Sequence, residues 1–326
     1  MKIAITGEKG FIAQNLINEI KKSNHEFVSI DDNFIGMKKR ETGEVCVHQN
    51  NENDWVEILR QLKVDAIVHN AATVGTDVVA LNPVDSIQTN ILGTQNITNA
   101  ANKLNILNVY IGTTVIYDTY KYQDSLIREN SDVYPRTNYA IQKYAGEMIV
   151  RNNAKEWLVM RPLFAYGGSG DPNSLIAKTF YSHKKNIQIP MFLDPEKKKD
   201  YMYVTDFCHA ILRAIDSNIR NEDFNVSVED AKTTKDIVEL MSKTCDFDLE
   251  KIIDWKTNTD YLGNHLLSCN KFNAMIGFNK PKIDLELGIM KVWSNILNDK
   301  SDYNPLKYLD EAADKNIDLI SFFPKK

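Results

Sequence analysis

The chain has 326 residues, of which 43% are hydrophobic and 25% charged, and its formal net charge is −5. This length can bury the core of one large α/β domain or of two unequal lobes, and the composition is ordinary for a soluble globular protein. The modest negative charge argues against general binding to nucleic acid or to an anionic membrane, so we expect neither partner.

Cysteine usage and the lack of long apolar runs narrow the class further. Cys46, Cys208, Cys245 and Cys269 are scattered without a CxxC pair, which argues against a zinc ribbon or a disulfide framework. No His, Cys and Asp cluster has metal-ligand spacing, so we expect no metal. The segment before Gly7 is too short for a signal peptide and no run reaches membrane-spanning length, which predicts a cytoplasmic protein.

Short apolar runs alternate with helical patterns over the first half of the chain. The runs typical of buried strands are residues 2–6, 26–30, 65–69, 106–111 and 157–161. Apolar residues at helical spacing occupy residues 10–22, 55–62, 83–104 and 138–150. Strands that alternate with helices predict an α/β fold built on a doubly wound parallel sheet.

The alternation weakens after Pro162. Residues 163–200 are richer in Gly, Pro, Asn and Lys, as expected of loops that build a binding cleft. Residues 201–204 and 224–228 are candidates for further strands that return to the main sheet. The part from about residue 229 onward indicates a smaller mixed lobe with a charged helical tail, for which the pattern suggests no function.

Three small residues, Gly7, Gly10 and Ala13, recur at every third position where the first strand meets the first helix. They fit either a plain structural turn or a dinucleotide pyrophosphate on the first turn of the helix. In the second case Gly7 permits the tight turn, Gly10 lets the backbone approach the pyrophosphate, and Ala13 allows close packing. Asp31 lies about 20 residues on, where such sites carry an acid, and this favours cofactor binding.

This interpretation divides the chain into two parts. Residues 1–162, with return segments at about 201–228, form an NAD-binding Rossmann domain, and residues 163–200 and 229–326 form a smaller mixed α/β substrate lobe.

Asp31 also bears on the choice of cofactor. A carboxylate at that strand end accepts hydrogen bonds from the adenosine ribose hydroxyls and repels a 2′-phosphate, so NAD is favoured. Lys9 and the Lys38–Arg40 cluster are basic groups that could meet a 2′-phosphate, which keeps NADP possible.

The stretch YPRTNYAIQKYAGE places Tyr139 and Lys143 four residues apart, on one helical face. A tyrosine with a pKa of about 10 is a poor base, and a neighbouring ammonium lowers that pKa by favouring the phenolate. Such a pair also occurs by chance on exposed helices, so the pair alone does not establish catalysis.

Six motifs in order carry a family resemblance. They are the GxxGxxA turn at 7–13, DAIVHNAA at 65–72, the helix that contains Asn90, TTVIY at 113–117, P-x-x-x-Y-x-x-x-K-x-x-x-E at 135–147 and KDYMYVTD at 199–206, and GFNKP at 277–281 resembles a late turn of the same family. Through them, residues 1–295 resemble the extended short-chain dehydrogenase/reductase family, in its nucleotide-sugar epimerase, dehydratase and reductase branch.

The resemblance implies an enzyme with a defined set of site residues. Thr113, Tyr139 and Lys143 would be catalytic. The cofactor would be bound by Gly7, Gly10, Phe11, Ile12, Asp31, Asp32, Asn70, Ala71, Ala72, Asn90, Tyr139 and Lys143. The nucleotide-activated sugar would be bound by Thr73, Thr114, Phe164 and Lys199. Family members also suggest a homodimer that joins the helices at about 84–103 and 138–150.

Departures from the family narrow the reaction. The 4,6-dehydratases carry Asp-Glu directly after the catalytic threonine, where this chain has Thr114 and Val115. The epimerase-reductases acting at C3 and C5 carry a cysteine at the position of Val115. Phe164 replaces an asparagine that contacts the nucleotide diphosphate in many relatives, and Lys199 replaces an arginine. We expect an NAD-dependent C4 epimerase. The alternatives are an NAD(P)H-dependent 4-keto-sugar nucleotide reductase and a non-catalytic NAD(H)-sensing regulator.

Overall fold

The computed structural model describes residues 1–31, 45–46, 51–171, 174–256, 262–277, 282–301 and 303–314. Within them, seven parallel strands form one sheet in the order β11-β6-β5-β4-β1-β2-β3. In that order they are Glu222–Val226, Trp157–Pro162, Leu107–Ile111, Ala66–His69, Lys2–Thr6, Glu26–Asp31 and Val45–Cys46. The predicted α/β fold with a doubly wound parallel Rossmann sheet is confirmed, and so are the five strands expected in the first half of the chain.

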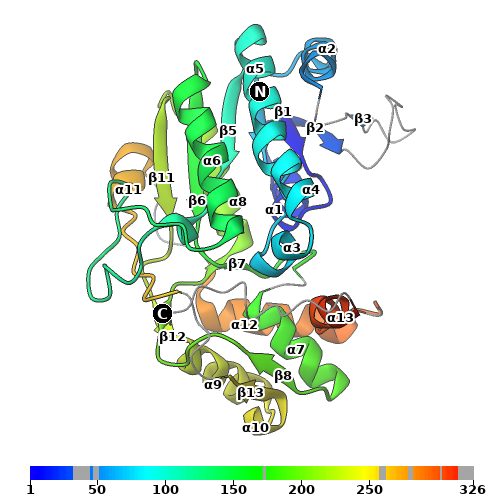
Figure 1. The fold of residues 1–326 in the computed structure, drawn as a ribbon, viewed down its shortest axis with the longest axis vertical. Helices are drawn as coiled ribbons and strands as arrows, with labels where there is room; N and C mark the ends of the chain where they lie inside the picture. Colours follow the sequence, from blue (N-terminus) through cyan, green and yellow to red (C-terminus); the bar gives the residue numbers. More distant parts are fainter. Residues whose placement is uncertain are drawn as a thin grey trace.

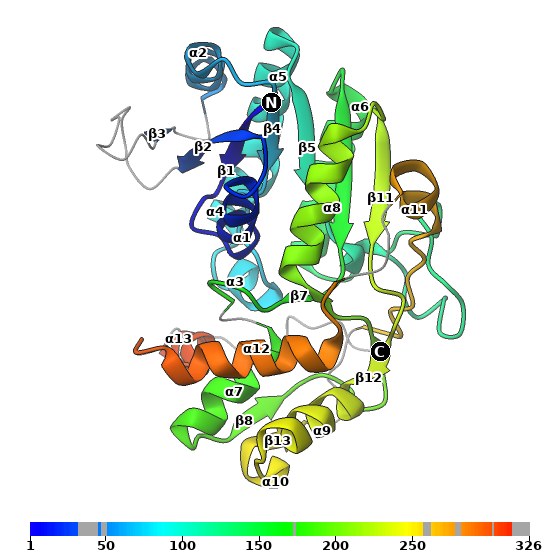
Figure 2. The same cartoon turned by 180° about the vertical axis from the view of Figure 1, so that it is seen from behind.

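Helices cover both faces of this sheet because side chains of each strand alternate between the faces. In β1, Ile3 and Ile5 enter the core against α1 and α8, whereas Ala4 enters the core against α2 and α5. Figure 1 shows α4, α5 and α6 in front of the sheet, and Figure 2 shows α1 and α8 on the opposite face. These helices are α1 (Phe11–Ile20), α2 (Glu52–Leu62), α4 (Pro83–Ile87), α5 (Thr94–Leu104), α6 (Asn138–Asn153) and α8 (Val204–Asp216).

The long helix expected at 83–104 is interrupted. A π-helical segment, η1 (Gln88–Gly93), separates α4 from α5, and a short helix α3 (Thr76–Leu81) precedes them. A π segment shifts the helical phase, and periodicity of apolar residues alone does not reveal it. Such segments often occur at functional sites, and η1 carries the buried Asn90.

One predicted return segment is confirmed and the other is wrong. Residues 224–228 correspond to β11, which pairs with β6 at the sheet edge. Residues 201–204 do not join the sheet, because β10 (Met202–Tyr203) pairs with β7 (Ala165–Tyr166) instead. The side chain of Met202 enters the core of the main sheet, and that of Tyr203 enters the core of the lobe. Because adjacent residues of this segment are buried in two different cores, its apolar run has the same sequence pattern as a strand of the main sheet.

The second part of the chain has a hydrophobic core of its own, which includes Ile176, Phe180, Ile237, Met241 and Ile289. Its elements are α7 (Leu175–Lys185), β8 (Ile189–Met191), β9 (Lys198–Lys199), β12 (Lys232–Thr233), α9 (Thr234–Cys245), α10 (Leu249–Ile252), β13 (Ile253–Trp255), α12 (Leu285–Asn298) and α13 (Lys307–Asp314). This lobe lies beyond the carboxyl ends of the sheet strands (Figure 1), while α11 (Asn270–Ile276) packs on β11. The proposed division into two domains stays a prediction.

No helix in the described part of the chain is both long enough and apolar enough to cross a bilayer.

A buried ion network ties α6 to the sheet. The Arg161 guanidinium donates to both carboxylate oxygens of Glu147 at 2.9 and 2.6 Å, and to Asp223 at 2.5 Å. It also donates to the Tyr117 hydroxyl at 2.7 Å. Arg161 and Glu147 are each 1% exposed, so breaking the pair would leave a charge without water.

We therefore expect Glu147→Gln to lower the free energy of unfolding by about 3 kcal/mol, because the buried guanidinium loses one of its two carboxylate partners. Urea unfolding followed by circular dichroism measures this. The matched control is Glu156→Gln, since the Glu156 carboxylate is 61% exposed in its pair with Arg220 and should contribute less than about 1 kcal/mol. Equal effects of the two substitutions would contradict this assignment.

Candidate functional site

The turn between β1 and α1 requires glycine. Gly7 has a φ of +68°, and a Cβ placed there would lie 2.8 Å from Ala71 Cα. A Cβ on Gly10 would lie 3.0 Å from Asn70 Nδ2. The Gly10 N–H bonds Gly7 O at 2.8 Å, which closes the turn. Among the described residues, no side chain caps α1 and no acid occupies its first turn, so its N–H groups are available to an anion. The turn therefore fits a dinucleotide pyrophosphate.

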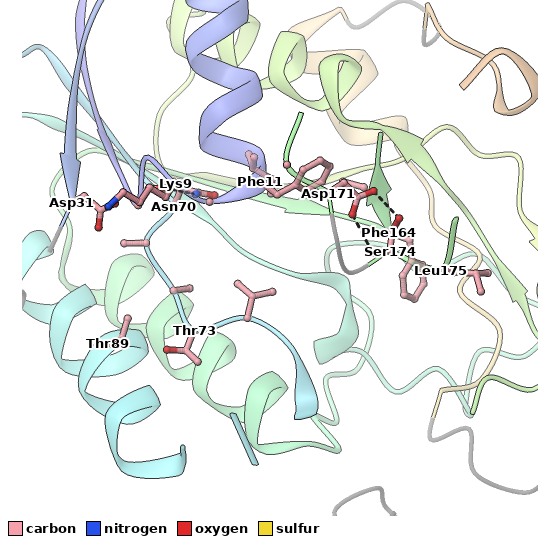
Figure 3. A pocket seen from close by; sticks show the side chains of 18 of the residues that line it. Lys9, Phe11, Asp31, Asn70, Thr73, Thr89, Phe164, Asp171, Ser174 and Leu175 are labelled. Carbon is pink, nitrogen blue, oxygen red and sulfur yellow. Dashed lines mark hydrogen bonds between the residues drawn. The ribbon is translucent and has the colours of Figure 1, made fainter. Parts of the chain in front are cut away.

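A cavity of about 750 Å³ opens over this turn, between the sheet and the lobe. Its size is in the range of sites for small molecules and cofactors. The predicted site residues that line it are Gly7, Gly10, Phe11, Ile12, Asp31, Asn70, Ala71, Ala72, Thr73 and Phe164. Figure 3 shows Asp31 and Lys9 at one end of the cavity and Phe164 and Leu175 at the other.

The two ends of the cavity differ in chemistry. At the polar end Lys9 and Asp31 extend toward each other (Figure 3), so an acid and a base share the place predicted for the adenosine ribose. At the other end Phe164 stacks on Tyr201 with ring centroids 5.5 Å apart. Asp32 and the Lys38–Arg40 cluster lie outside the described residues.

Asn90 lies behind the cavity wall. It is 1% exposed, its Oδ1 accepts from Thr73 N at 2.8 Å, and its Nδ2 donates to Thr73 O at 3.0 Å. The same Nδ2 donates to Gln142 Oε1 on α6 at 2.9 Å. Asn90 thus braces the loop that lines the cavity, and its role as a cofactor-binding residue stays a prediction.

The three predicted catalytic residues come from neighbouring elements. Thr113 follows β5 and precedes η2 (Thr114–Ile116), which packs against α6. Tyr139 and Lys143 lie one turn apart on α6, whose first turn is capped by Thr137. Tyr139 is half-buried, whereas Thr113 and Lys143 are 8% and 4% exposed. These side chains lie at the carboxyl end of the sheet but do not themselves line the cavity over the glycine turn.

Burial governs the charge of Lys143. It lowers the pKa of Lys143 to about 7, against the opposing effect of the Glu147 carboxylate. The ammonium lies 4.3 Å from the centre of the Tyr110 ring, whose face attracts a cation. Burial and the Lys143 charge also lower the pKa of His69 to about 3. His69 bonds the hydroxyls of Thr6 and Thr94 at 3.0 Å each, so it is a neutral, satisfied residue of the core.

The residues predicted to bind the sugar nucleotide lie in different surroundings. Thr114 is 1% exposed and donates to Pro162 O at 3.4 Å. Lys199 is fully buried and lines a second cavity of about 590 Å³, which shares Tyr201 with the first. The imidazole of His265, also fully buried, meets the edge of Phe164 with ring centroids 5.6 Å apart. Burial and the charge of Lys199 lower the pKa of His265 to about 3.

Several wall residues were missed from the sequence. Leu175, Leu193 and Tyr201 line the cavity beside Phe164, together with Asp171 and Ser174. Asp171 accepts from Ser174 N at 3.0 Å and from its hydroxyl at 2.6 Å, and Ser174 caps α7. Ser174 could have been found, because a serine is a preferred residue at the start of a helix. Tyr201 could have been found too, because it lies in the KDYMYVTD motif. The leucines carried no pattern of their own.

The glycine turn yields a direct test. We expect Gly7→Ala to weaken NADH binding by about 10-fold or more, because its Cβ would meet the Ala71 backbone and displace both walls of the turn. Fluorescence titration with NADH measures the affinity. Gly277→Ala is the matched control, since Gly277 has a similar φ of +74° but no atom within 4 Å of a Cβ there. Equal NADH affinity in both variants would contradict the assignment of this turn.

The chain is similar to several known proteins. A model of the "NAD dependent epimerase/dehydratase family" matches residues 3–227. A putative UDP-glucose 4-epimerase of Methanocaldococcus jannaschii is 25% identical over 301 residues, which cover 89% of this chain and 96% of that protein.

Two solved structures illustrate the likeness of the fold. The UDP-glucose 4-epimerase of Thermotoga maritima, crystallised with UDP-glucose, has a TM-score of 0.78 at 21% identity and covers 91% of this chain and 99% of its own. The dTDP-glucose 4,6-dehydratase of Bacillus anthracis, in complex with NAD, has a TM-score of 0.79 at 19% identity, with 92% and 97% covered. The family match spans more than half of the chain and agrees with the motifs. The chain belongs to the NAD dependent epimerase/dehydratase family and is an enzyme of the extended short-chain dehydrogenase/reductase type whose cofactor is NAD.

Proposed function

We propose that the protein is a nucleotide-sugar C4 epimerase. The observation that carries the proposal is the placement of Tyr139 and Lys143 on α6, which packs against η2 directly after Thr113, at the carboxyl end of the sheet where the cofactor cavity opens. Thr114 and Val115 replace the Asp-Glu pair with which the family's 4,6-dehydratases eliminate water, and Val115 replaces the cysteine of its enzymes that act at C3 and C5. Hydride transfer at a single carbon is the chemistry that the remaining groups support.

The protein groups would divide the work as follows. When bound, NAD supplies the hydride chemistry. Tyr139, as the phenolate, would take the proton from the hydroxyl at C4, and the resulting phenol would return it, while the Thr113 hydroxyl bonds the same oxygen. The Lys143 ammonium favours the Tyr139 phenolate, whose pKa would otherwise be about 10. A positioned sugar replaces a bimolecular encounter, which supplies much of the rate.

The two ends of the cavity suggest how a substrate lies. With the adenosine ribose at Asp31, the sugar nucleotide would approach from the end of Phe164, Tyr201 and Leu193. The charge of Lys199 in the adjoining cavity suits a phosphate, although a lysine lacks the two-pronged geometry of an arginine. The similarity to a putative UDP-glucose 4-epimerase supports a nucleotide hexose as substrate.

A 4-keto-sugar nucleotide reductase is the second candidate. Phe164 favours it, since some keto-sugar reductases of this branch also lack the asparagine at that position. Lys9 beside Asp31 favours it too, because a base at the ribose end would accommodate the 2′-phosphate of NADPH. A non-catalytic NAD(H) sensor would need none of Thr113, Tyr139 and Lys143, which are all present. A cytoplasmic location stays a prediction.

The family resemblance also leads us to propose a homodimer through α4, η1 and α6. Large apolar side chains are exposed on these neighbouring helices: Val84 by 66%, Ile87 by 48%, Leu92 by 43% and Ile141 by 49%. Exposed apolar residues that gather on adjacent elements mark a protein interface more often than isolated ones do.

Tyr139→Phe tests the catalytic assignment. We expect C4 inversion of the accepted nucleotide hexose to slow on the order of 100-fold or more, because the proton-transferring hydroxyl is lost. NADH affinity should stay nearly unchanged. Steady-state NMR assays with UDP-, dTDP- and GDP-hexoses measure the rate, and Tyr134→Phe, at a tyrosine that is 56% exposed, is the control. Full activity in Tyr139→Phe would refute the assignment.

Ile87→Glu tests the dimer. The new charge would be buried in the proposed interface, so we expect the variant to be a monomer when its mass is measured by light scattering after gel filtration. Met290→Glu places the same charge on α12, where the side chain is 53% exposed, and should leave the mass unchanged. A monomeric parent protein, or a dimeric Ile87→Glu variant, would contradict the proposal.

A further inference from the structure

The chain continues past α12 into a segment that the function described so far does not use. We call residues 299–301 and 303–314 the C-terminal arm. Its start is fixed to α7: the Tyr181 hydroxyl donates to Asp299 Oδ2 at 2.5 Å. The Lys184 ammonium donates to the carbonyls of Ile296 and Asp299 at 2.6 and 2.5 Å.

Apolar contacts hold the rest of the arm in place. The ring of Tyr303 packs on that of Tyr181, with centroids 4.4 Å apart. Leu306 packs against the lobe core, and Ala312 in α13 is 3% exposed. Helix α13 packs against α3, beside which it lies in both Figure 1 and Figure 2. The arm therefore reaches from the substrate lobe to a helix that follows directly after the Thr73–Val74 wall of the cofactor cavity.

Between the arm and the glycine turn lies a third cavity, of about 570 Å³. Asp299, Ser301 and Tyr303 of the arm line one side of it, and Lys9 and Gln14 of the nucleotide-binding domain line the other. This cavity shares Lys9, Gly170 and Asp171 with the cofactor cavity. The arm thus lines a space that adjoins the cofactor cavity beside the glycine turn, and it connects the lobe to α3 on the other side of the cofactor cleft.

We propose that the C-terminal arm ties the two sides of the cofactor cleft together and that NAD leaves only when the arm moves away from α3 and α7. The arm slows release of the cofactor without taking part in the chemistry. The proposal rests on the proposed function in one respect: an epimerase needs the same NAD in its next turnover, so slow release serves it directly.

A displacement experiment in the absence of sugar tests this proposal. Protein loaded with NADH is mixed with excess NAD, and the fall in NADH fluorescence gives the release rate. In Tyr303→Ala/Leu306→Ala, which removes the ring contact and the lobe anchor, we expect release to be on the order of 10-fold faster, with association little changed. Leu297→Ala is the matched control, because Leu297 lies just before the arm on α12 but is 54% exposed.

Each outcome decides the question. A purely structural arm would lower the unfolding temperature of the double variant and leave release at the parent rate, which would overturn the proposal. If the double variant fails to fold, Tyr181→Phe decides, since it removes only the hydroxyl bond to Asp299. Faster release in this variant supports the proposal, and an unchanged rate refutes it. Failure of the epimerase proposal would leave NADH release measurable and would show only as absent C4 inversion.

Discussion

The rest of the structure depends on the buried ion network that the Arg161 guanidinium forms with two carboxylates. It joins Glu147 on α6 to Asp223 on β11, and thereby fixes the helix that carries Tyr139 and Lys143 against the sheet. Charges buried this deeply persist only when they are fully paired, so the helix has little freedom to shift. The Glu147 carboxylate also lies one turn from Lys143, where it raises the pKa that burial lowers. One carboxylate therefore serves both the fold and the charge state of the proposed active site.

Close contacts around Gly146 allow α6 to approach Asn90, which holds the loop at Thr73 that lines the cofactor cavity. A Cβ on Gly146 would lie 2.5 Å from the Tyr110 hydroxyl and 3.0 Å from Asn90 O, so only glycine permits this approach. Across this contact Asn90 bonds both the backbone of Thr73 and the side chain of Gln142. The wall of the cavity and the proposed catalytic helix are thus held by the same side chain. Preorganisation of this kind places reacting groups before a substrate arrives.

The sequence was informative wherever a short-range rule applied. Strands buried on both faces, such as β1 and β4, appear as apolar runs in the sequence. The turn at Gly7 has a positive φ, which favours glycine, so the glycine itself marks the turn. The approach of Phe164 to Tyr201 and His265 was not predictable, because it joins three segments distant in the chain. The π segment at Asn90 and the placement of β10 between two cores were missed for a related reason. Tertiary packing decides both, and it leaves no period in the sequence.

C4 inversion without added cofactor tests the epimerase assignment. Protein purified without NAD is incubated with UDP-, dTDP- and GDP-hexoses, and the configuration at C4 is followed by NMR. The nucleotide released on denaturation is then identified by mass spectrometry. For an epimerase that keeps its cofactor we expect many turnovers per site, no net NADH, and retained NAD in a stoichiometric amount. Absence of inversion, together with reduction of a 4-keto-sugar nucleotide at the expense of added NADH or NADPH, would contradict the epimerase assignment and identify a reductase.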